Sequence, residues 1–469
     1  MAQEQQRAPL FEALLSYTER VRAPLHIPGH KMGRAAPPAW RSFLGDQALS
    51  IDLTEAPGLD DLHAPEGVIA EAQALAAEAF GATRSYFLVG GTTAGLHALI
   101  LTACRPGDTL AVPRHAHRAV LGAMVLAGVR PHWVRVAFHP ELGVATHLDP
   151  ASLDQALPGA AAAVLVNPTY YGIASRLADA VERIHRAGIP VLVDEAHGSH
   201  FAFHPAMPPS ALSLGADGVV QSLHKTGGSL TQSSLCHLGR ESYLQESRLR
   251  EMLRLVQSTS PSYLLMASLD LARRNLALNG EALWEQAIEM AHLARRRLAA
   301  LAGIRVHPSD DPTKILIDVR GRQITGFQAA QALWEQSGVA VEASGLTYVL
   351  AVLSPGDSRS TIDTLVGAVE RLPSGDGAPP LPPEPPWPEV VLSPREAFLG
   401  TKRAVPLRQA VGRISAELVA PYPPGIPVVA PGERLSKEVV DYLGQAVDAG
   451  YHLQGPADPH LRSIQVMEE

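Results

Sequence analysis

The chain has 469 residues, 46% of them hydrophobic, so it can bury a large core and should contain more than one domain. Its formal net charge of −8 argues against nucleic-acid binding and mildly favours cationic ligands. The two cysteines form no disulfide framework, the first residues lack a basic segment leading into a long apolar core, and no stretch reaches ~18 uninterrupted apolar residues, so we expect a cytoplasmic protein that does not span a membrane.

Strand-like and helix-like segments alternate through the first half of the chain. An N-terminal arm over residues 1–30 precedes residues 31–280, where apolar runs such as TLAVP, AAVLVN, PVLVDEA and GVVQSL are separated by helical stretches such as GVIAEAQALAAEAF and RLADAVERIHRAG. This alternation predicts a large α/β domain with a wound, mainly parallel sheet.

The second half predicts smaller pieces. A helix, EALWEQAIEMAHLARRRLAAL, leads into further strand and helix segments, which we assign to a small α/β domain over residues 281–372. Residues 373–388 are rich in proline, which forbids helix and central strand, and are predicted to be a linker. Residues 389–469 contain helix-like pieces around the turn APYPPGIP and are predicted to form a short C-terminal domain.

The segment SYFLVGGTTAGLHALILTA predicts a strand, a small-residue turn and a helix. Gly90, Gly91, Thr92 and Thr93 occupy the turn. Small residues let backbone N–H groups approach an anion, and the helix N-terminus adds partial positive charge. The turn can therefore hold a phosphate, although ordinary helix capping would use the same residues.

Two further strands end in residues that carry chemistry. The apolar run in GIPVLVDEAHGSHF ends at Asp194, and GVVQSL is followed closely by Lys225. Open α/β sheets bind ligands beyond the carboxyl ends of their strands, so we expect both side chains to face one crevice. A lysine directly after a buried strand is expected to be desolvated and easier to deprotonate, as a nucleophilic amine should be.

These three features together indicate pyridoxal 5'-phosphate (PLP). This cofactor needs a lysine for its aldehyde, an aspartate that keeps its pyridine nitrogen protonated, and hydrogen-bond donors for its phosphate. The competing hypothesis is a metal site, because histidines occur at 115, 117, 197, 200 and 204. The sequence contains no HExxH and no paired CxxC, so we expect no metal.

The same stretches carry a family resemblance that covers nearly the whole chain. The matching segments are HIPGHKMG from 26, DLTEAPGLDDLHAPEGVIAEAQ from 52, FLVGGTTAG from 87, VPRHAHRAV from 112, VNPTYYG from 166, VLVDEAHGSHFAFHP from 191, SLHKTGGSLTQSS from 222 and GRISAELVAPYPPGIPVVAPGE from 412. On these segments the chain resembles the ornithine/lysine/arginine decarboxylases, which are PLP enzymes with the aspartate aminotransferase-like fold (fold type I). It is most similar to the short members that look like biosynthetic arginine decarboxylases.

The resemblance implies roles around the cofactor ring. Lys225 would hold the cofactor covalently and be released by substrate, and Asp194 would pair with the pyridine nitrogen. Ala196 would pack on one ring face and His117 would stack on the other, unless His117 is a buried structural histidine. Either His224 or Lys225 would donate the proton that replaces the lost carboxylate.

The resemblance also implies contacts around the phosphate. Gly91, Thr92, Thr93 and Ser222 would contact the phosphate of their own subunit, although the family often has Asn-Gly-Ser/Thr where this chain has Gly90-Gly91-Thr92. Thr231 would reach the phosphate of a partner in a homodimer, or a higher homo-oligomer, with shared active sites. His197 would lie near the ring, with a role in cofactor binding or in folding.

The expected reaction is decarboxylation of a basic amino acid. Because HIPGHK begins at residue 26, we expect the chain to lack the N-terminal wing of the longer, acid-induced members, which points to a biosynthetic enzyme. Among the short members we favour L-arginine as the substrate, giving agmatine for polyamine synthesis. Lysine and ornithine remain alternatives, as do transamination, aldol cleavage or elimination on the same fold and a binding protein that has lost catalysis. We expect Glu433, or the pair Asp60 and Asp61, to bind the distal cation of the substrate, with helix capping as the alternative.

Overall fold

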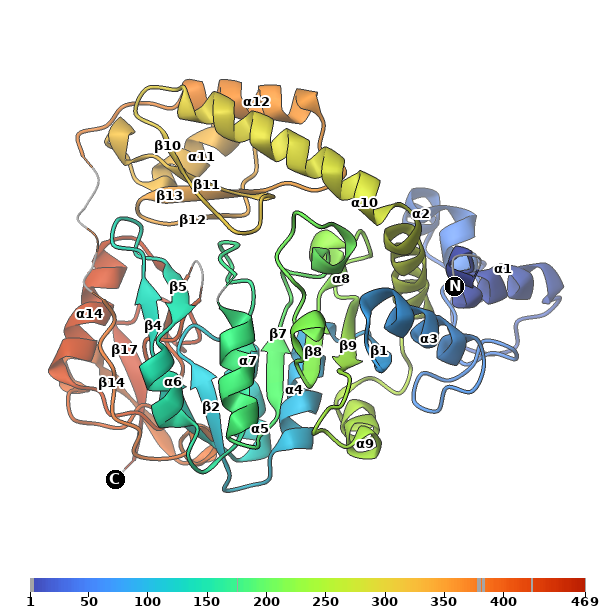
Figure 1. Ribbon diagram of the computed structural model, residues 1–469, viewed down its shortest axis with the longest axis horizontal. Helices are drawn as coiled ribbons and strands as arrows, with labels where there is room; N and C mark the ends of the chain where they lie inside the picture. Colours follow the sequence, from blue (N-terminus) through green and yellow to red (C-terminus); the bar gives the residue numbers. More distant parts are fainter. Residues whose placement is uncertain (1–3, 175, 378–380, 382–383, 423–424, 469) are drawn as a thin grey trace. The chain divides into compact units, whose positions relative to one another are not determined.

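The computed structural model describes residues 4–174, 176–377, 381, 384–422 and 425–468 (Figure 1). The chain divides into two compact units, each made of two segments. One contains Met1–Ala103 and Pro190–Glu281, and the other contains Cys104–Ile189 and Ala282–Glu469. The boundaries of the consecutive domains predicted above stay predictions.

The first unit is built on strands that alternate with helices. Its segments before residue 104 are η1 (Glu4–Gln6), α1 (Pro9–Arg20), α2 (Pro38–Ser50), α3 (Val68–Phe80), β1 (Arg84–Leu88) and α4 (Gly91–Ala103). After residue 189 come β7 (Val191–Asp194), η2 (Phe201–Phe203), η3 (Leu212–Leu214), β8 (Gly218–Gln221), α8 (Leu223–Thr226), β9 (Ser234–Leu238) and α9 (Glu246–Val256). The long helix α10 (Tyr263–Ala299) contains the boundary between the two units.

The strands of the first unit lie in the order β1-β9-β8-β7. Strands β7 and β8 are parallel, whereas β9 runs antiparallel to both β8 and β1. Every residue of β7 and β8 is buried, which explains why both read as uninterrupted apolar runs with a polar last residue.

Close packing brings helix α4 down onto β8. A Cβ atom added at Gly95 would lie 2.6 Å from a methyl carbon of Val220 and 2.7 Å from one of Leu88. Only a residue without a side chain allows this approach. The packing fixes the N-terminus of α4 beside the carboxyl end of β8, where the predicted site residues lie.

The first part of the second unit completes the α/β alternation. It contains β2 (Thr109–Pro113), α5 (Arg118–Ala127), β3 (Arg130–Val134), β4 (Val136–Phe138), β5 (Ala145–Leu148), α6 (Pro150–Ala156), β6 (Ala160–Val166) and α7 (Leu177–Arg186). Strand β2 lies between β6 and β3 and is parallel to both. The predicted α/β class with a mainly parallel sheet is therefore confirmed.

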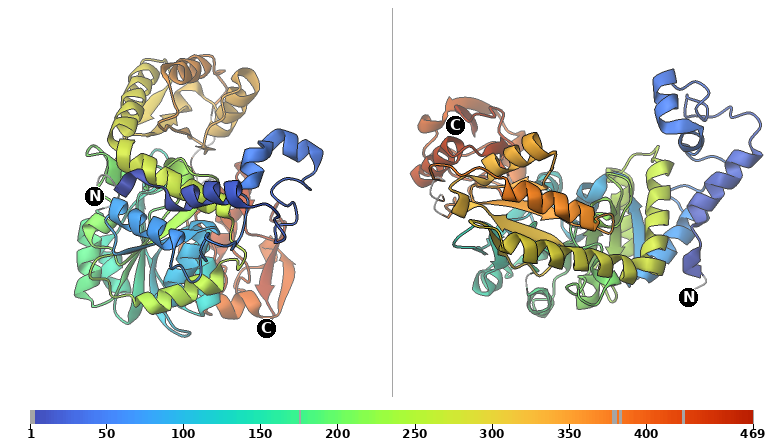
Figure 2. Two further views of the ribbon diagram at one scale, coloured as in Figure 1. Left: turned by 90° about the vertical axis from the view of Figure 1, so that its right-hand side faces the viewer. Right: turned by 90° about the horizontal axis from the view of Figure 1, so that it is seen from above.

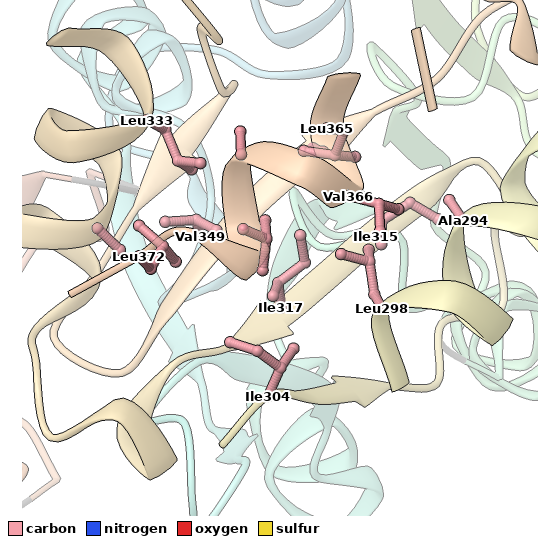
Figure 3. Close-up of a cluster of buried hydrophobic side chains, with 14 of the residues drawn as sticks. Ala294, Leu298, Ile304, Ile315, Ile317, Leu333, Val349, Leu365, Val366 and Leu372 are labelled. Atoms are coloured by element: carbon pink, nitrogen blue, oxygen red, sulfur yellow. The ribbon is translucent and has the colours of Figure 1, made fainter. Parts of the chain in front are cut away.

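The middle of the second unit is an antiparallel sheet in the order β10-β11-β13-β12. Its elements are β10 (Arg305–His307), β11 (Lys314–Asp318), η4 (Arg320–Arg322), α11 (Gly326–Ser337), β12 (Ala343–Ser344), β13 (Tyr348–Val352) and α12 (Arg359–Glu370). Figure 3 shows its core, in which Leu298 of α10, Leu333 of α11 and Leu365 of α12 pack on Ile315 and Ile317 of the sheet. The three helices thus cover one face.

The last part of the second unit has a core of its own. It contains α13 (Pro394–Leu399), β14 (Lys402–Pro406), η5 (Leu407–Gln409), β15 (Ala420–Tyr422), α14 (Lys437–Asp448), β16 (His452–Gln454) and β17 (Ser463–Met467). Strands β14 and β17 form one antiparallel pair and β15 and β16 another. Val419, Leu435, Val439 and Ile464 are among the apolar side chains buried between them and α14.

The cysteines and the helices bear on the expectations that the chain has no disulfide framework and no membrane span. Cys104 and Cys236 are both buried, and they form no disulfide. Among the helices of the described residues, none combines the length and apolar character needed to cross a bilayer.

Candidate active site

The N-terminus of α4 forms an anion-binding corner with the segment after β8. The helix begins at Gly91, whose φ of 70° is the left-handed conformation that suits glycine. The fully buried Ser222 donates its hydroxyl hydrogen to Thr92 Oγ1 over 3.3 Å and does not cap α8. Because the first N–H groups of a helix have no intrahelical acceptor, these groups together can hold a phosphate. Thr93, predicted to share this role, is exposed.

Asp194 ends β7 beside this corner. It is buried, pairs in register with Val220 of β8, and accepts the backbone N–H of Ala196 on Oδ1 over 3.1 Å. Ala196 is itself 7% exposed. The sheet therefore brings Asp194, Ala196 and Ser222 to one edge, as the strand-end argument predicts.

Lys225 lies in the single turn of α8, and the prediction that it is desolvated is wrong. Strand β8 ends at Gln221, Ser222 begins the turn, and the Lys225 side chain is exposed. Its Nζ lies 2.9 Å from Nε2 of His197, the residue that follows Ala196. The structure thus places a lysine amine and an imidazole in contact beyond the ends of β7 and β8.

His224 precedes the lysine and is half-buried. Its Nδ1 lies 2.9 Å from the carbonyl oxygen of Ser233, which can only accept, so Nδ1 carries the hydrogen and Nε2 is the basic nitrogen of the neutral ring. Burial, and secondly the charge of Lys225, lower the pKa of His224. At neutral pH this imidazole is therefore mostly uncharged.

Thr231 and His117 are both exposed. Thr231 lies in the turn between α8 and β9, and its contact with a partner subunit stays a prediction. His117 caps α5 in the second unit, where its Nδ1 accepts the N–H of Ala119 over 3.2 Å. It is not the buried structural histidine considered as an alternative, and its stacking on a cofactor ring stays a prediction.

Glu433 is not placed to receive a substrate cation. Its carboxylate is 1% exposed and forms a bidentate ion pair with Arg114, with Arg114 Nη2 lying 2.8 Å from Oε2. It does not cap α14 either, because Ser436 supplies that cap. Both interpretations of Glu433 from the sequence are therefore wrong, since neither considered an arginine on a segment more than three hundred residues away.

Asp60 is also used by the protein itself. Its Oδ1 accepts the backbone N–H groups of Asp61 and Glu66, and its Oδ2 accepts those of Gly67, Ile69 and Ala70. These bonds lower the pKa of Asp60 against the opposing effect of its burial. Asp60 thus organises the loop before α3, which is the capping alternative. The carboxylate of Asp61 accepts the backbone N–H of His63 on Oδ1 over 2.8 Å.

A buried polar chain behind the site was not predicted. Glu195, next to Asp194, accepts the Ala211 N–H on one oxygen and the Gln221 side-chain amide on the other, each over 2.7 Å. Gln221 Oε1 lies 3.1 Å from His237 Nε2, and His237 Nδ1 lies 2.7 Å from the Ser85 hydroxyl. The chain links the ends of four strands. Its signal in the sequence is a polar residue inside an apolar run, as in GVVQ and SLCHL.

Comparison with known proteins identifies the family of the chain. The sequence pattern of the Orn/Lys/Arg decarboxylase major domain matches residues 8–309, and that of the Orn/Lys/Arg decarboxylase C-terminal domain matches residues 385–457. The chain belongs to the Orn/Lys/Arg decarboxylase family. The resemblance stated from the sequence motifs is confirmed, and an amino-acid decarboxylase is the enzyme class that this membership supports.

Individual relatives cover almost the whole chain. It is 40% identical to the arginine decarboxylase of Bacillus subtilis (strain 168) over 99% of both chains. It is also 40% identical to that of Halalkalibacterium halodurans, over 99% of this chain and 98% of the relative. Among solved structures, lysine decarboxylase A from Pseudomonas aeruginosa superposes with a TM-score of 0.84 at 23% identity, covering 98% of this chain and 80% of that one, which establishes a shared fold.

Proposed function

We propose that this protein decarboxylates L-arginine to agmatine and carbon dioxide with the help of PLP. The observation that carries the choice of substrate is the 40% identity to arginine decarboxylases over the full chain, against 23% to the lysine decarboxylase that shares its fold. The observation that supports the chemistry is the cluster of Lys225, His197, Asp194 and Ser222 beyond the ends of two parallel strands.

The residues of the first unit fit PLP. The N-terminus of α4, Thr92 and Ser222 would hold the phosphate, buried Asp194 would face the pyridine nitrogen, and Lys225 would take the aldehyde. When bound, the cofactor supplies an electron sink for the bond that breaks at the α-carbon. Asp194 would keep that sink effective, because a carboxylate beside the pyridine nitrogen favours its protonated form.

The proton that replaces the carboxylate is better supplied by Lys225 than by His224. A proton donor must carry its proton before the step, and burial lowers the pKa of His224, so its charged form is scarce at neutral pH. The Lys225 amine lies at the site already, 2.9 Å from His197, and is able to carry a proton once substrate has released it from the cofactor. We assign His224 the role of holding the α8 turn against Ser233.

Asp61 is the remaining carboxylate of those predicted to meet the substrate guanidinium. The carboxylates of Glu433 and Asp60 are committed to protein partners, whereas the half-buried carboxylate of Asp61 accepts the N–H of His63 on Oδ1. A carboxylate with an available oxygen can pair with a guanidinium.

We also propose a homodimer or higher homo-oligomer, working in the cytoplasm in polyamine biosynthesis. The support for assembly is an exposed apolar surface on α2. Trp40 and Phe43 of α2 are 52% and 81% exposed, and their rings stack with centroids 6.0 Å apart. Figure 2 shows α2 projecting away from the other helices of the first unit. Large apolar side chains presented in this way are typical of an interface.

The first experiment is to incubate the purified protein with PLP and with arginine, lysine or ornithine separately, and to measure carbon dioxide and amine. Agmatine from arginine alone is the expected result. Cadaverine or putrescine would keep the reaction and replace the substrate. A control with Lys225→Ala should form no amine and lose the absorbance of the bound cofactor. If the wild type shows that absorbance and forms neither gas nor amine, the decarboxylase assignment is overturned and another reaction of this fold must be sought.

A further inference from the structure

The segment that leads to His117 is anchored by a buried arginine in the second unit. Arg114 follows β2 directly, and its side chain is almost fully buried. Its guanidinium donates from Nε to the Pro427 carbonyl over 2.9 Å and from Nη2 to the Val428 carbonyl over 2.7 Å. The same group lies 4.5 Å above the ring of Trp133. Arg114 therefore binds the segment before Glu433 as well as Glu433 itself.

Glu433 completes this clamp from the C-terminal part of the chain. Both of its oxygens accept from Arg114, and Oε2 also accepts the N–H of Ala430 over 2.7 Å. Its backbone carbonyl accepts the N–H of Ser415 over 2.8 Å. A buried ion pair is tolerated only with such extensive hydrogen bonding, because both ions lose their hydration. The pair is consequently held in one geometry.

Little chain separates this clamp from His117. Two residues, His115 and Ala116, lie between them, and the turn is tied by hydrogen bonds from Arg114 N to the Val134 carbonyl over 3.1 Å and from Ala116 N to the Pro113 carbonyl over 2.9 Å. His117 itself is exposed and held by its cap of α5. A displacement of the Arg114 backbone would therefore reach His117 through only two intervening residues.

We infer that Arg114 and Glu433 are positioning residues, through which residues 427–433 fix the loop that presents His117. The inference rests on the proposed function and on the role that the family resemblance implies for His117, which is to stack on the cofactor ring. It gives residues 427–433 a part in catalysis that acts through His117. Positioning of this kind is worth a large rate factor, because small displacements of a group that orients the reacting centre are costly.

The test is a mutant cycle. Glu433→Gln and Arg114→Lys are each combined with His117→Ala, since lysine keeps the charge of Arg114 but not its bidentate fork. The matched control is Arg130→Gln. Arg130 also joins the first segment of this unit to the C-terminal part, through an exposed pair with Glu396 at 3.6 Å, and lies away from the loop. For Glu433→Gln we expect kcat to fall by about 100-fold in the wild-type background, with KM changing little.

In the His117→Ala background, Glu433→Gln should lower kcat no further, and Arg130→Gln should change neither constant. An equal loss of kcat with and without His117 would overturn the inference, because the pair would then act elsewhere. If Glu433→Gln fails to fold, Arg114→Lys provides the same cycle.

A second readout does not depend on turnover. We expect Arg114→Lys and His117→Ala to change the circular dichroism of the bound cofactor in the same way, and the double variant to show no additional change. Unchanged dichroism in Arg114→Lys would count against the inference even if activity fell. If the wild type binds PLP but decarboxylates none of the three amino acids, the proposed function fails alone, and this spectroscopic comparison still decides the role of the clamp.

Discussion

The side chain of Lys225 is exposed although Leu223 and Thr226 of the same helical turn are buried, so we expect its chemistry to depend on neighbouring groups rather than on an apolar pocket. Its amine contacts His197 over 2.9 Å, and the residue before it is a histidine whose pKa is lowered by burial. A protonated imidazole can donate a proton and a neutral imidazole can accept one, so the role of each histidine depends on its protonation state. The state of His224 is therefore a property that can be tested at a single residue.

We expect His224→Gln to keep most of its activity. Glutamine can donate to the Ser233 carbonyl in place of Nδ1–H, so the α8 turn should survive. If Lys225 is the proton donor, kcat should fall less than about tenfold, below the usual contribution of a general acid. The measurement is kcat for arginine from pH 6 to 9 in both proteins.

A different result would assign the proton to His224. In that case wild-type kcat should rise as the pH falls towards the lowered pKa of His224, because the imidazolium becomes more abundant. The glutamine variant would then lose that rise together with at least about 100-fold in kcat. Coincident pH profiles of the two proteins are what our assignment requires.

At the scale of elements, the contact between α4 and β8 sets the position of the phosphate corner. Alanine at Gly95 would place its Cβ 2.6 Å from Val220, so we expect Gly95→Ala to cost about 1–3 kcal/mol of stability by overpacking. The displaced helix should also bind PLP more weakly. Thermal unfolding and a PLP titration measure the two effects.

Gly444→Ala is the matched control for this substitution. Gly444 also lies inside a helix, α14, but an added Cβ would meet nothing within 4 Å. Alanine there should leave PLP affinity unchanged and stabilise the protein by about 0.5–1 kcal/mol. Equal effects of the two substitutions on PLP affinity would show that the packing of α4 on β8 does not position the corner.

The polar chain across β7, β8, β9 and β1 makes the first unit sensitive to acid. Burial lowers the pKa of His237 to about 3, from an ordinary value of 6.5. The unfolded chain therefore binds a proton at this residue below pH 6.5 that the folded chain does not, and stability is lost as the pH falls from 6.5 towards 3. The loss amounts to about 1.4 kcal/mol per pH unit.

His237→Gln should be less stable than the wild type at pH 7.5 and should lack this loss. The difference in free energy of unfolding between the two proteins is therefore expected to shrink as the pH falls from 6.5 to 5. Denaturant unfolding at three pH values measures it. A difference that stays constant over this range would mean that His237 is protonated in the folded protein.

Local sequence patterns were enough to predict the two strands and the turn that carry the site residues. The buried runs VLVD and GVVQ became β7 and β8, and the turn GGTT began α4, because burial on both faces and small residues before a helix leave direct traces in sequence. The errors concern side chains. Whether Lys225 is exposed depends on the residue at which β8 ends. A local sequence pattern predicts the end of a strand only to within one or two residues.

Long-range pairing was not predictable from one chain. Glu433 and Arg114 lie on segments that come together only in the folded second unit. The local sequence around either residue does not predict the other as its partner. Asp60 was a candidate ligand for the substrate cation for a related reason. The five backbone N–H groups that it accepts converge on its carboxylate only after the loop before α3 has folded. A carboxylate in a matching motif can be bound internally as readily as it can bind substrate.

At the scale of the whole molecule, the property to test is the oligomeric state. The N-terminal arm is fixed to α10 by buried contacts, because Asp270 accepts the N–H of Leu10 and Arg273 donates to the carbonyl of Arg7. Helix α2 follows this anchored arm along the chain, and its exposed Trp40 and Phe43 are suited to bind a second copy.

We therefore expect Trp40→Ser combined with Phe43→Ser to shift the protein towards monomer and to lower its activity. Removing two large apolar side chains from an interface costs binding free energy, and Thr231 can serve a partner's phosphate only in an oligomer. Light scattering coupled to gel filtration, with kcat measured at the same protein concentrations, gives both quantities. The control is Trp334→Ser on α11, where the tryptophan is 63% exposed but lies outside α2. A double variant that is monomeric yet fully active would separate assembly from catalysis and remove the shared site, whereas an unchanged oligomer would place the interface elsewhere.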